Sequence, residues 1–423
     1  MTRSRPAVEI VTIGTELVLG TTPESNGAWL GRTLAAAGVV VTRRTAVPDD
    51  HAAIRAAVED ALRSTGIVLC TGGLGPTRDD FTKPVVADLY GVGLEVDERW
   101  LAVVRQRFEE RGIAMPASNR SQAEVPRGAL LFPNAHGTAP GLALDDAGRG
   151  LTILLPGVPA EMQALVEEHV LPFLLARFQD LPNPIVSRVI RTTGISESVL
   201  AERIDDLVDG VAPLTLAFLP AFTGEDLRLT SWGAFPAGTA EQLLDRAEQA
   251  LRERLGAAVY GTGDADLATV VGERLRARRL TLAVAESCTG GLVAKRLTDA
   301  AGASDFFLAG WVSYSNAAKA ALLGVAPALI ERHGAVSEPV VRAMADGARA
   351  AAGADCAIAI TGIAGPGGGS PDKPVGTVWI AVAMGTTVTA RGLLLGGDRG
   401  EIRERSAQAV IALLLRLLEE DAR

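Results

Sequence analysis

Apolar runs rich in β-branched residues alternate with helical stretches along most of this 423-residue chain, and this alternation restricts the fold most strongly. The pattern begins with a strand-like run at residues 8–13, a helical stretch at 26–37, a strand at 39–42 and a helix at 50–64. Strands that alternate with helices form βαβ units. The sequence therefore predicts an α/β protein with mostly parallel sheets.

Changes in this pattern divide the chain into parts. Proline-rich residues 181–184 mark the end of the first alternating region, and a shorter mixture of strands and helices follows. The stretch VYGTGDAD then indicates a linker, after which strands and helices alternate again. The predicted parts are an α/β domain, a small α+β module, a linker and a second α/β domain, which span residues 1–172, 173–257, 258–265 and 266–423.

The composition excludes several classes of function. A net charge of −9 and a pI of about 5.2 argue against a protein that coats nucleic acid or an acidic membrane. No apolar run approaches the ~20 residues that span a bilayer, so we expect no membrane partner. The three cysteines include no C-x-x-C pair, which favours a reducing cytoplasm; they are Cys70, Cys288 and Cys356.

Residues 283–297, AVAESCTGGLVAKRL, place polar side chains where an apolar strand meets a helix. Ligands bind at the carboxyl ends of parallel strands, and a helix start offers unpaired amides. The Ser287 hydroxyl is thus placed to attack a carbonyl, with Thr289 and Gly290 beside it to hold an oxyanion. For a lone motif of this kind, a helix cap is the simpler interpretation. Two further stretches favour a catalytic interpretation over a helix cap.

The first of these stretches is WVSYSNAAKAALLG, residues 311–324. A strand delivers Tyr314, and Ser315 or Asn316 caps a helix that carries Lys319. A lysine in a partly dry site has a lowered pKa and can act as a base, while a tyrosine hydroxyl can relay the proton. Taken singly, a surface lysine and a half-buried tyrosine are common.

The second stretch is AIAITGIAGPGGGSPDKPVGT, residues 357–377, in which a buried strand opens into a glycine-rich loop. Such loops hold phosphates through backbone amides, although a flexible hairpin connection is the plainer alternative. The motif GDRGE adds an arginine at another strand-to-helix turn, where a guanidinium can meet a phosphate. The predicted substrate-binding residues here are Thr361, Gly362, Gly365, Gly367 and Arg399.

A comparable loop lies in the first part of the chain, where TGGLGPTRDD follows the strand at 67–70. Its backbone and hydroxyl donors suit an anion, and the carboxylates beside them suit a divalent metal that bridges to a pyrophosphate. Capping of the next helix by Asp79 or Asp80 is the alternative. The predicted phosphate-binding residues are Thr71, Gly72, Gly73 and Gly75, and the predicted metal ligands are Asp79, Asp80 and Glu16.

The motifs AESCTGG, YSNAAK and TGIAGPGGG together resemble the C-terminal domain of CinA-type proteins and the stand-alone PncC enzymes, over about residues 264–423. That resemblance implies an amidohydrolase that converts nicotinamide mononucleotide to nicotinic acid mononucleotide and ammonia. It implies Ser287 as the nucleophile, activated by Tyr314 and Lys319, and no metal for this step. Cys288 is a rival nucleophile on chemistry alone, and we expect it to face the interior.

The first part resembles the molybdopterin-binding fold of MogA- and MoeA-like proteins, and more closely the N-terminal domain of CinA over about residues 6–172. This implies metal-dependent hydrolysis of ADP-ribose, with Mg²⁺ or a similar divalent ion. A pterin-type pocket that binds without catalysis is the competing interpretation. The middle part resembles the KH-like module of CinA, but it contains no GXXG loop and its local charge is negative, so we expect a structural or dimer-forming role.

The whole chain therefore resembles a full-length CinA protein. The implied fold is two three-layer α/β domains joined by a small α+β KH-like module. The implied partners are the nucleotides nicotinamide mononucleotide and ADP-ribose and a second copy of the chain, in a cytoplasmic pathway of NAD salvage. Nucleic acid is not expected as a partner. The alternative function is a non-catalytic adaptor in competence or DNA-damage response.

Overall fold

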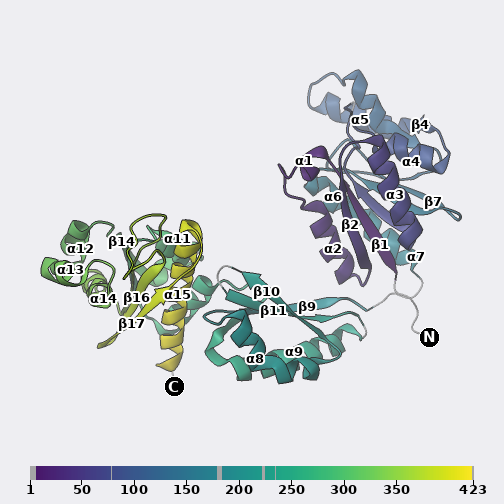
Figure 1. Cartoon of the computed structure of the whole chain (residues 1–423). Coiled ribbons are helices and arrows are strands. Elements are labelled where there is room, and N and C mark those ends of the chain that lie inside the picture. Colours follow the sequence, from purple (N-terminus) through teal and green to yellow (C-terminus); the bar gives the residue numbers. More distant parts are fainter. Residues whose placement is uncertain (1–5, 78, 179–182, 222–223, 234, 422–423) are drawn as a thin grey trace. The chain divides into compact units, whose positions relative to one another are not determined.

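The computed structural model describes residues 6–421 except 78, 179–182, 222–223 and 234. The chain forms two compact units, the first of residues 1–186 with 232–240 and the second of 187–231 with 241–423. Both units are built from alternating helices and strands (Figure 1), which confirms the α/β class.

A six-stranded sheet forms the centre of the first unit, in the order β2-β1-β3-β8-β7-β6. The first four of these strands are parallel, and β7 and β6 add an antiparallel edge. A separate antiparallel ribbon pairs β4 with β5. The strands are β1 (Ala7–Ile13), β2 (Val40–Val47), β3 (Ile67–Thr71), β4 (Leu94–Val96), β5 (Glu124–Pro126), β6 (Leu130–Phe132), β7 (Gly141–Asp146) and β8 (Gly150–Leu155).

Helices cover both faces of this sheet, so the first unit has three layers (Figure 1). On one face α3 and α4 contribute Val58 and Val86 to the core, and on the other α2 and α6 contribute Leu30 and Leu165. The helices are α1 (Thr15–Val18), α2 (Asn26–Ala36), α3 (His51–Thr65), α4 (Thr82–Tyr90), α5 (Glu98–Glu110), α6 (Pro159–Leu165) and α7 (Leu171–Arg177), with short helical turns η1 (Ala117–Ala123) and η2 (Val166–Val170).

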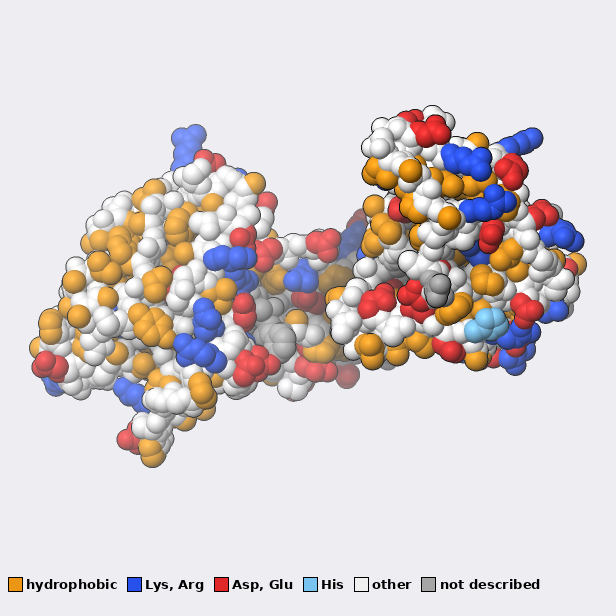
Figure 2. All heavy atoms as spheres, turned by 90° about the horizontal axis from the view of Figure 1, so that it is seen from above, with side chains coloured by type: hydrophobic (Ala, Val, Ile, Leu, Met, Phe, Trp, Pro, Cys, Tyr) orange, Lys and Arg blue, Asp and Glu red, His pale blue; other side chains and the backbone are white. Residues whose placement is uncertain are grey.

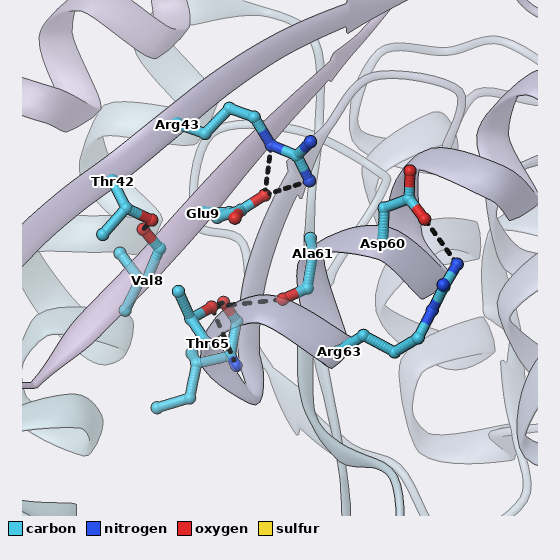
Figure 3. A network of polar contacts seen from close by, with 9 residues as sticks. Val8, Glu9, Thr42, Arg43, Asp60, Ala61, Arg63 and Thr65 are labelled. Atoms are coloured by element: carbon cyan, nitrogen blue, oxygen red, sulfur yellow. Dashed lines mark hydrogen bonds and ion pairs between the residues drawn. The ribbon is translucent and has the colours of Figure 1, made fainter.

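An ion pair joins the edge strand β2 to its neighbour β1 (Figure 3). Glu9 in β1 is 3 % exposed, and its carboxylate accepts from the guanidinium of Arg43 in β2 at 2.7 Å. At the end of α3, the Thr65 hydroxyl donates to the carbonyls of Ala61 and Ile67. Pairing with Arg43 offsets the cost of burying the Glu9 carboxylate between these two strands.

The second unit begins with a four-stranded sheet in the order β10-β11-β9-β12, as an α+β module. Its elements are β9 (Val186–Thr192), α8 (Glu197–Val208), η3 (Asp209–Val211), β10 (Thr215–Ala221), β11 (Gly224–Ser231), α9 (Ala237–Leu255), η4 (Gly256–Ala258) and β12 (Val259–Thr262). β12 pairs antiparallel with β9. The prediction of a linker over 258–265 was therefore wrong, because its Val-Tyr pair is buried as part of this sheet.

A five-stranded sheet in the order β14-β13-β15-β16-β17 forms the rest of the second unit. β13 lies parallel to β14 and β15, whereas β16 and β17 extend the sheet antiparallel. Helices α10, α11 and α15 pack on one face and α12, α13 and α14 on the other. The strands are β13 (Leu282–Glu286), β14 (Phe307–Val312), β15 (Cys356–Gly362), β16 (Thr377–Met384) and β17 (Thr387–Leu394).

The helices of this part begin with α10, which Asp266 caps. The last helix, α15, starts with a capping box formed by Asp398 and Glu401, which fixes where the helix begins. The bounds are α10 (Leu267–Arg278), α11 (Leu292–Thr298), η5 (Ala303–Asp305), α12 (Asn316–Leu323), α13 (Pro327–His333), α14 (Glu338–Ala352) and α15 (Arg399–Glu420).

Acidic and basic side chains are interspersed over the faces of both units seen in Figure 2, with no extended basic stripe on view. Within the described ranges, no helix is both long and apolar enough to cross a bilayer.

Candidate active site

The nucleophile turn, residues 286–291, is built on the carboxylate of Glu286. This side chain ends β13, is 1 % exposed and accepts hydrogen bonds from the first amides of α11. Oε2 accepts from Gly291 and Val293 at 3.0 and 3.1 Å, and Oε1 from Ala294 at 2.9 Å. The acid thus satisfies the orphan amides of the helix start and complements its partial positive charge.

The next residue, Ser287, contacts a buried lysine. The Lys319 Nζ lies 3.0 Å from the Ser287 Oγ, and it also donates to the carbonyls of Ser313 at 2.9 Å and Tyr314 at 3.3 Å. Lys319 is 1 % exposed. Burial lowers the pKa of its ammonium group, which favours the neutral amine. A neutral amine beside a serine hydroxyl is a base in position to accept its proton.

Local sequence explains how the lysine reaches the serine. Ser315 is the N-cap of α12, and its side chain accepts from the amide of Ala318 at 3.1 Å, so one of the two predicted caps is confirmed. Lys319 follows in the first turn of that helix, directed toward the end of β13. The prediction that Tyr314 and Lys319 arise from one strand-to-helix turn is therefore matched by the structure.

Tyr314 takes a different place from the one its predicted relay needs. Its hydroxyl accepts from Arg399 Nη2 at 3.0 Å, and the side chain is 57 % exposed. In the described part of the chain, no hydrogen bond joins this hydroxyl to Ser287 or Lys319. Tyr314 holds the lysine through its backbone carbonyl instead. Of the two residues, only Lys319 has a side chain that contacts the Ser287 hydroxyl.

The glycine-rich loop is fastened to the same site by Arg399. Its Nη1 donates to the carbonyl of Gly365 at 2.7 Å, so one guanidinium bridges this loop and Tyr314. Gly362 lies against the nucleophile turn, because a Cβ there would come within 3.1 Å of the Cys288 Sγ. Gly367 is exposed and lies farther out on the loop. The Thr361 hydroxyl donates to the Ala335 carbonyl at 2.9 Å and is therefore already engaged.

The predicted oxyanion donors are only partly free. The Gly290 amide donates to the Ser287 carbonyl at 3.1 Å, which removes it from the predicted pair. The Thr289 amide has no hydrogen-bond partner among the residues that the structure describes. Sequence reasoning missed Arg403 in α15, whose Nη2 donates to the Thr289 carbonyl at 2.7 Å and so holds the turn from outside. Its position, four residues after Arg399 on one helix face, was the available signal.

Cys288 is not available as a nucleophile. Its side chain is 5 % exposed and belongs to the apolar core, which confirms the expectation that it faces the interior. Burial raises the pKa of the thiol to about 11, so the reactive thiolate is scarce at neutral pH.

The loop after β3 in the first unit is closed by Asp80. Its Oδ1 accepts from the Gly75 amide at 2.7 Å, and its Oδ2 accepts from the amide of Thr77 at 2.8 Å and from its hydroxyl. Gly72 and Gly73 adopt positive φ values of 111° and 64°. A Cβ on either residue would lie within 2.2 Å of a neighbouring oxygen, so this tight loop requires glycine at both positions.

The predicted metal ligands do not assemble. Both carboxylate oxygens of Asp80 are engaged by the loop, and Asp79 is exposed. Glu16 lines a hollow of about 140 Å³ together with Glu24, Asn26 and Thr71. Among the residues described, no group of three His, Cys, Asp or Glu side chains is close enough to hold a metal ion. The set Asp79, Asp80 and Glu16 therefore does not fit a metal in this arrangement.

A buried lysine beside this loop also escaped sequence reasoning. Lys83 in α4 is 4 % exposed, and its Nζ donates to the Ser121 carbonyl. Burial lowers the pKa of Lys83 to about 8, against the opposing effect of Glu124 and Asp80. Unlike Lys319, it has no hydrogen bond to a hydroxyl group among the residues that the structure describes.

Three family models match successive parts of the chain. The CinA C-terminal domain matches residues 264–418, a probable molybdopterin binding domain matches 9–176, and the damage-inducible protein CinA KH domain matches 187–261. The molybdopterin model coincides closely with the first predicted domain, and the CinA model begins just after β12.

Two similar proteins match nearly the whole chain, and a solved structure matches part of it. A CinA-like protein of Gemmatimonas aurantiaca is 48 % identical over 98 % of this chain and 97 % of its own length. A putative competence-damage inducible protein of Symbiobacterium thermophilum is 44 % identical over 97 % of this chain and 98 % of its own. A solved competence-damaged protein (CinA) superfamily protein from Klebsiella pneumoniae is 38 % identical, covers 36 % of this chain and 96 % of its own, and has a TM-score of 0.36.

Proposed function

The chain belongs to the CinA family, and from that premise we propose that its second unit is an amidohydrolase that converts nicotinamide mononucleotide to nicotinic acid mononucleotide and ammonia. The observation that carries this proposal is the 3.0 Å contact between the Ser287 Oγ and the buried Lys319 Nζ. The choice of nucleotide follows from the resemblance of the three motifs. The choice of a serine hydrolase mechanism follows from the geometry.

The reaction proceeds through an acyl-enzyme. Neutral Lys319 accepts the Ser287 proton as Oγ forms a bond to the carboxamide carbon, and the Thr289 amide is the proposed hydrogen-bond donor to the oxyanion. The carbon–nitrogen bond breaks, and Lys319 returns the proton to the departing ammonia. Water then adds to the ester with Lys319 as base, which releases the carboxylate and restores the serine hydroxyl.

Substrate positioning falls to the loop and to Arg399. The guanidinium is exposed and lies between the Gly365 carbonyl and the Tyr314 hydroxyl, at the mouth of the site. It retains donors for a phosphate, and the loop glycines leave room for a phosphate to approach the backbone.

The test is ammonia release from nicotinamide mononucleotide by the purified chain with a chelator present. We expect turnover in the wild type and in Cys288→Ala, and none above background in Ser287→Ala. Cys288→Ala is the matched control for disruption of the turn, because it changes the residue next to Ser287. Full turnover by Ser287→Ala would reject the serine mechanism, and no turnover by any form would favour the adaptor function.

We further propose that the first unit binds a phosphorylated nucleotide at the loop after β3, with ADP-ribose hydrolysis as its candidate reaction. The support is the rigid loop of residues 72–80 at the carboxyl end of a parallel strand. A metal requires ligands other than the predicted set, so no metal-dependent step is assigned to these residues. Adenosine monophosphate release from ADP-ribose, measured with Mg²⁺ and with chelator, tests this reaction. A homodimer, a cytoplasmic location and a role in NAD salvage remain predictions.

A further inference from the structure

A cleft of about 450 Å³ lies within the second unit, away from the nucleophile turn. One wall comes from the loop that follows β9 and from the start of β11. The other wall comes from Leu395 and from one face of α15. Its volume falls in the range typical of sites for small organic ligands.

The unusual feature of this cleft is the carboxylate of Glu225. This side chain lines the cleft, is 5 % exposed, and its Oε1 has no hydrogen-bond partner among the described residues. Burial raises the pKa of the Glu225 carboxyl, and the nearby charges of Glu197 and Asp226 raise it further. A buried carboxylate oxygen without a partner is costly, so its position suits a hydrogen-bond donor from a bound ligand.

The donors of the chain around this acid are engaged elsewhere. Arg405 lines the cleft, but its Nη1 donates to the Gly396 carbonyl at 2.6 Å. Arg191 pairs with Asp226 at 2.9 Å. Gln408 donates through its amide to the Thr193 hydroxyl at 3.1 Å. Among the described residues, no ion pair joins Glu225 to a cation, whereas the exposed Glu197 adds a second negative charge to the cleft.

Apolar side chains form much of the remaining lining, notably Ile195, Leu395 and Ala409. A ligand that matches this surface has one cationic donor for the acid and an apolar body for the walls. We infer that the cleft binds a small organic cation, a protonated amine with an apolar body, through Glu225. An anion or a neutral alcohol of the same shape lacks the charge that the acid requires.

The same cleft is connected to the amidase site by two routes. α15, which lines the cleft, carries Arg399 and Arg403, and these bond the glycine-rich loop and the nucleophile turn. Gln408 also accepts from Arg296 at 2.7 Å, and Arg296 belongs to α11, the helix that follows the turn. Binding in the cleft is therefore expected to change the amidase rate; this consequence rests on the proposed function.

Binding is tested by calorimetry on the full chain with three probes of one shape: phenethylamine, 2-phenylethanol and phenylacetate. We expect phenethylamine to bind at least tenfold more tightly than the alcohol, and phenylacetate to bind more weakly than either. Glu225→Gln should abolish the preference for the amine, while Glu202→Gln, which removes an exposed acid from α8 of the same module, should retain it. Equal binding of amine and alcohol, or a preference kept in a folded Glu225→Gln protein, would overturn the inference.

A rate measurement distinguishes failure of this inference from failure of the proposed function. Saturating phenethylamine should change kcat/KM for deamidation at least threefold in the wild type and leave Glu225→Gln unchanged. An unchanged wild-type rate with the amine bound would overturn the connection between the sites. If the free wild type does not deamidate the nucleotide at all, the proposed function fails, and the calorimetric result stands on its own.

Discussion

The nucleophile turn and the loop after β3 have similar local structures, but their acidic side chains occupy different positions. Each follows a buried strand, bends through adjacent glycines with positive φ and is organised by one acidic side chain. In the turn, Glu286 precedes the bend and caps the next helix. In the loop, Asp80 comes after the bend and closes the loop upon itself.

The position of the acid decides what remains free for chemistry. Glu286 bonds the amides of the helix start, and the Ser287 hydroxyl that follows it lies beside a buried lysine. Asp80 accepts hydrogen bonds from the loop with both oxygens, and the described residues hold no assembled ligand set for a metal. A glycine-rich strand end is therefore a scaffold, and the chemistry depends on which side chain the neighbouring elements bring to it.

The largest effect that would sharpen this comparison is the loss of the buried base. Lys319→Met should lower kcat/KM for deamidation by about 10² to 10⁴, the usual contribution of a positioned general base. Lys295→Met is the matched control, because that lysine pairs with Asp299 on the exposed face of α11. A Lys319→Met protein within threefold of the wild type would remove the base from the mechanism.

Sequence reasoning singled out Ser287 and Lys319, which lie 3.0 Å apart in the structure, but it did not predict their other contacts. Ser287 and Lys319 come from separate strand-to-helix turns, and the alternation of strands with helices was enough to place both turns at one sheet edge. The tyrosine relay did not follow, since rotamers decide whether a hydroxyl turns toward the lysine or toward Arg399, and sequence spacing does not report them. Likewise, β12 was mistaken for a linker because its pairing with β9 is a long-range contact.

The predicted metal ligands are not brought together in the structure, for a similar reason. Adjacent aspartates resemble a ligand pair in the sequence, yet each amide that a loop must satisfy competes with a metal for their oxygens. At Asp80, the carboxylate oxygens accept hydrogen bonds from the Thr77 and Gly75 amides. The antiparallel pairing of the short strands β6 and β7 was also not predicted, because their apolar runs are brief and the loop between them is polar.

A second test concerns pH. Because burial lowers the pKa of Lys319, kcat/KM should rise about tenfold per pH unit below that pKa and reach a plateau above it. The unfolded chain binds more protons between the lowered pKa and the ordinary value of 10.5. The stability of the wild type should therefore rise with pH in that window, relative to Lys319→Met. Initial rates and urea unfolding from pH 6 to 10 measure both effects; parallel stability curves would contradict the shift.

A third test compares the two organising acids directly. Glu286→Gln leaves a buried side chain that can no longer accept from all three helix amides, and should cost about 2–3 kcal/mol of unfolding free energy. Asp80→Asn, in a loop with partial exposure, should cost about 1–2 kcal/mol. Urea unfolding monitored by circular dichroism measures the two. The comparison breaks if Asp80→Asn is the more costly change, because the loop would then depend on its acid more than the helix start does.

The smallest expected effect belongs to the residue next to the nucleophile. Cys288→Ala should keep deamidation within about twofold of the wild type and cost about 1 kcal/mol of stability, because a buried cysteine acts as a small apolar side chain. With its pKa raised to about 11 by burial, the thiol should also resist iodoacetamide at pH 7. Mass spectrometry of the native protein measures this labelling, with the denatured protein as the reactive control. Rapid native labelling at Cys288 together with loss of turnover would show that the turn opens enough to expose the thiol. It would also weaken the proposal that Ser287 and Lys319 react in a site closed to water.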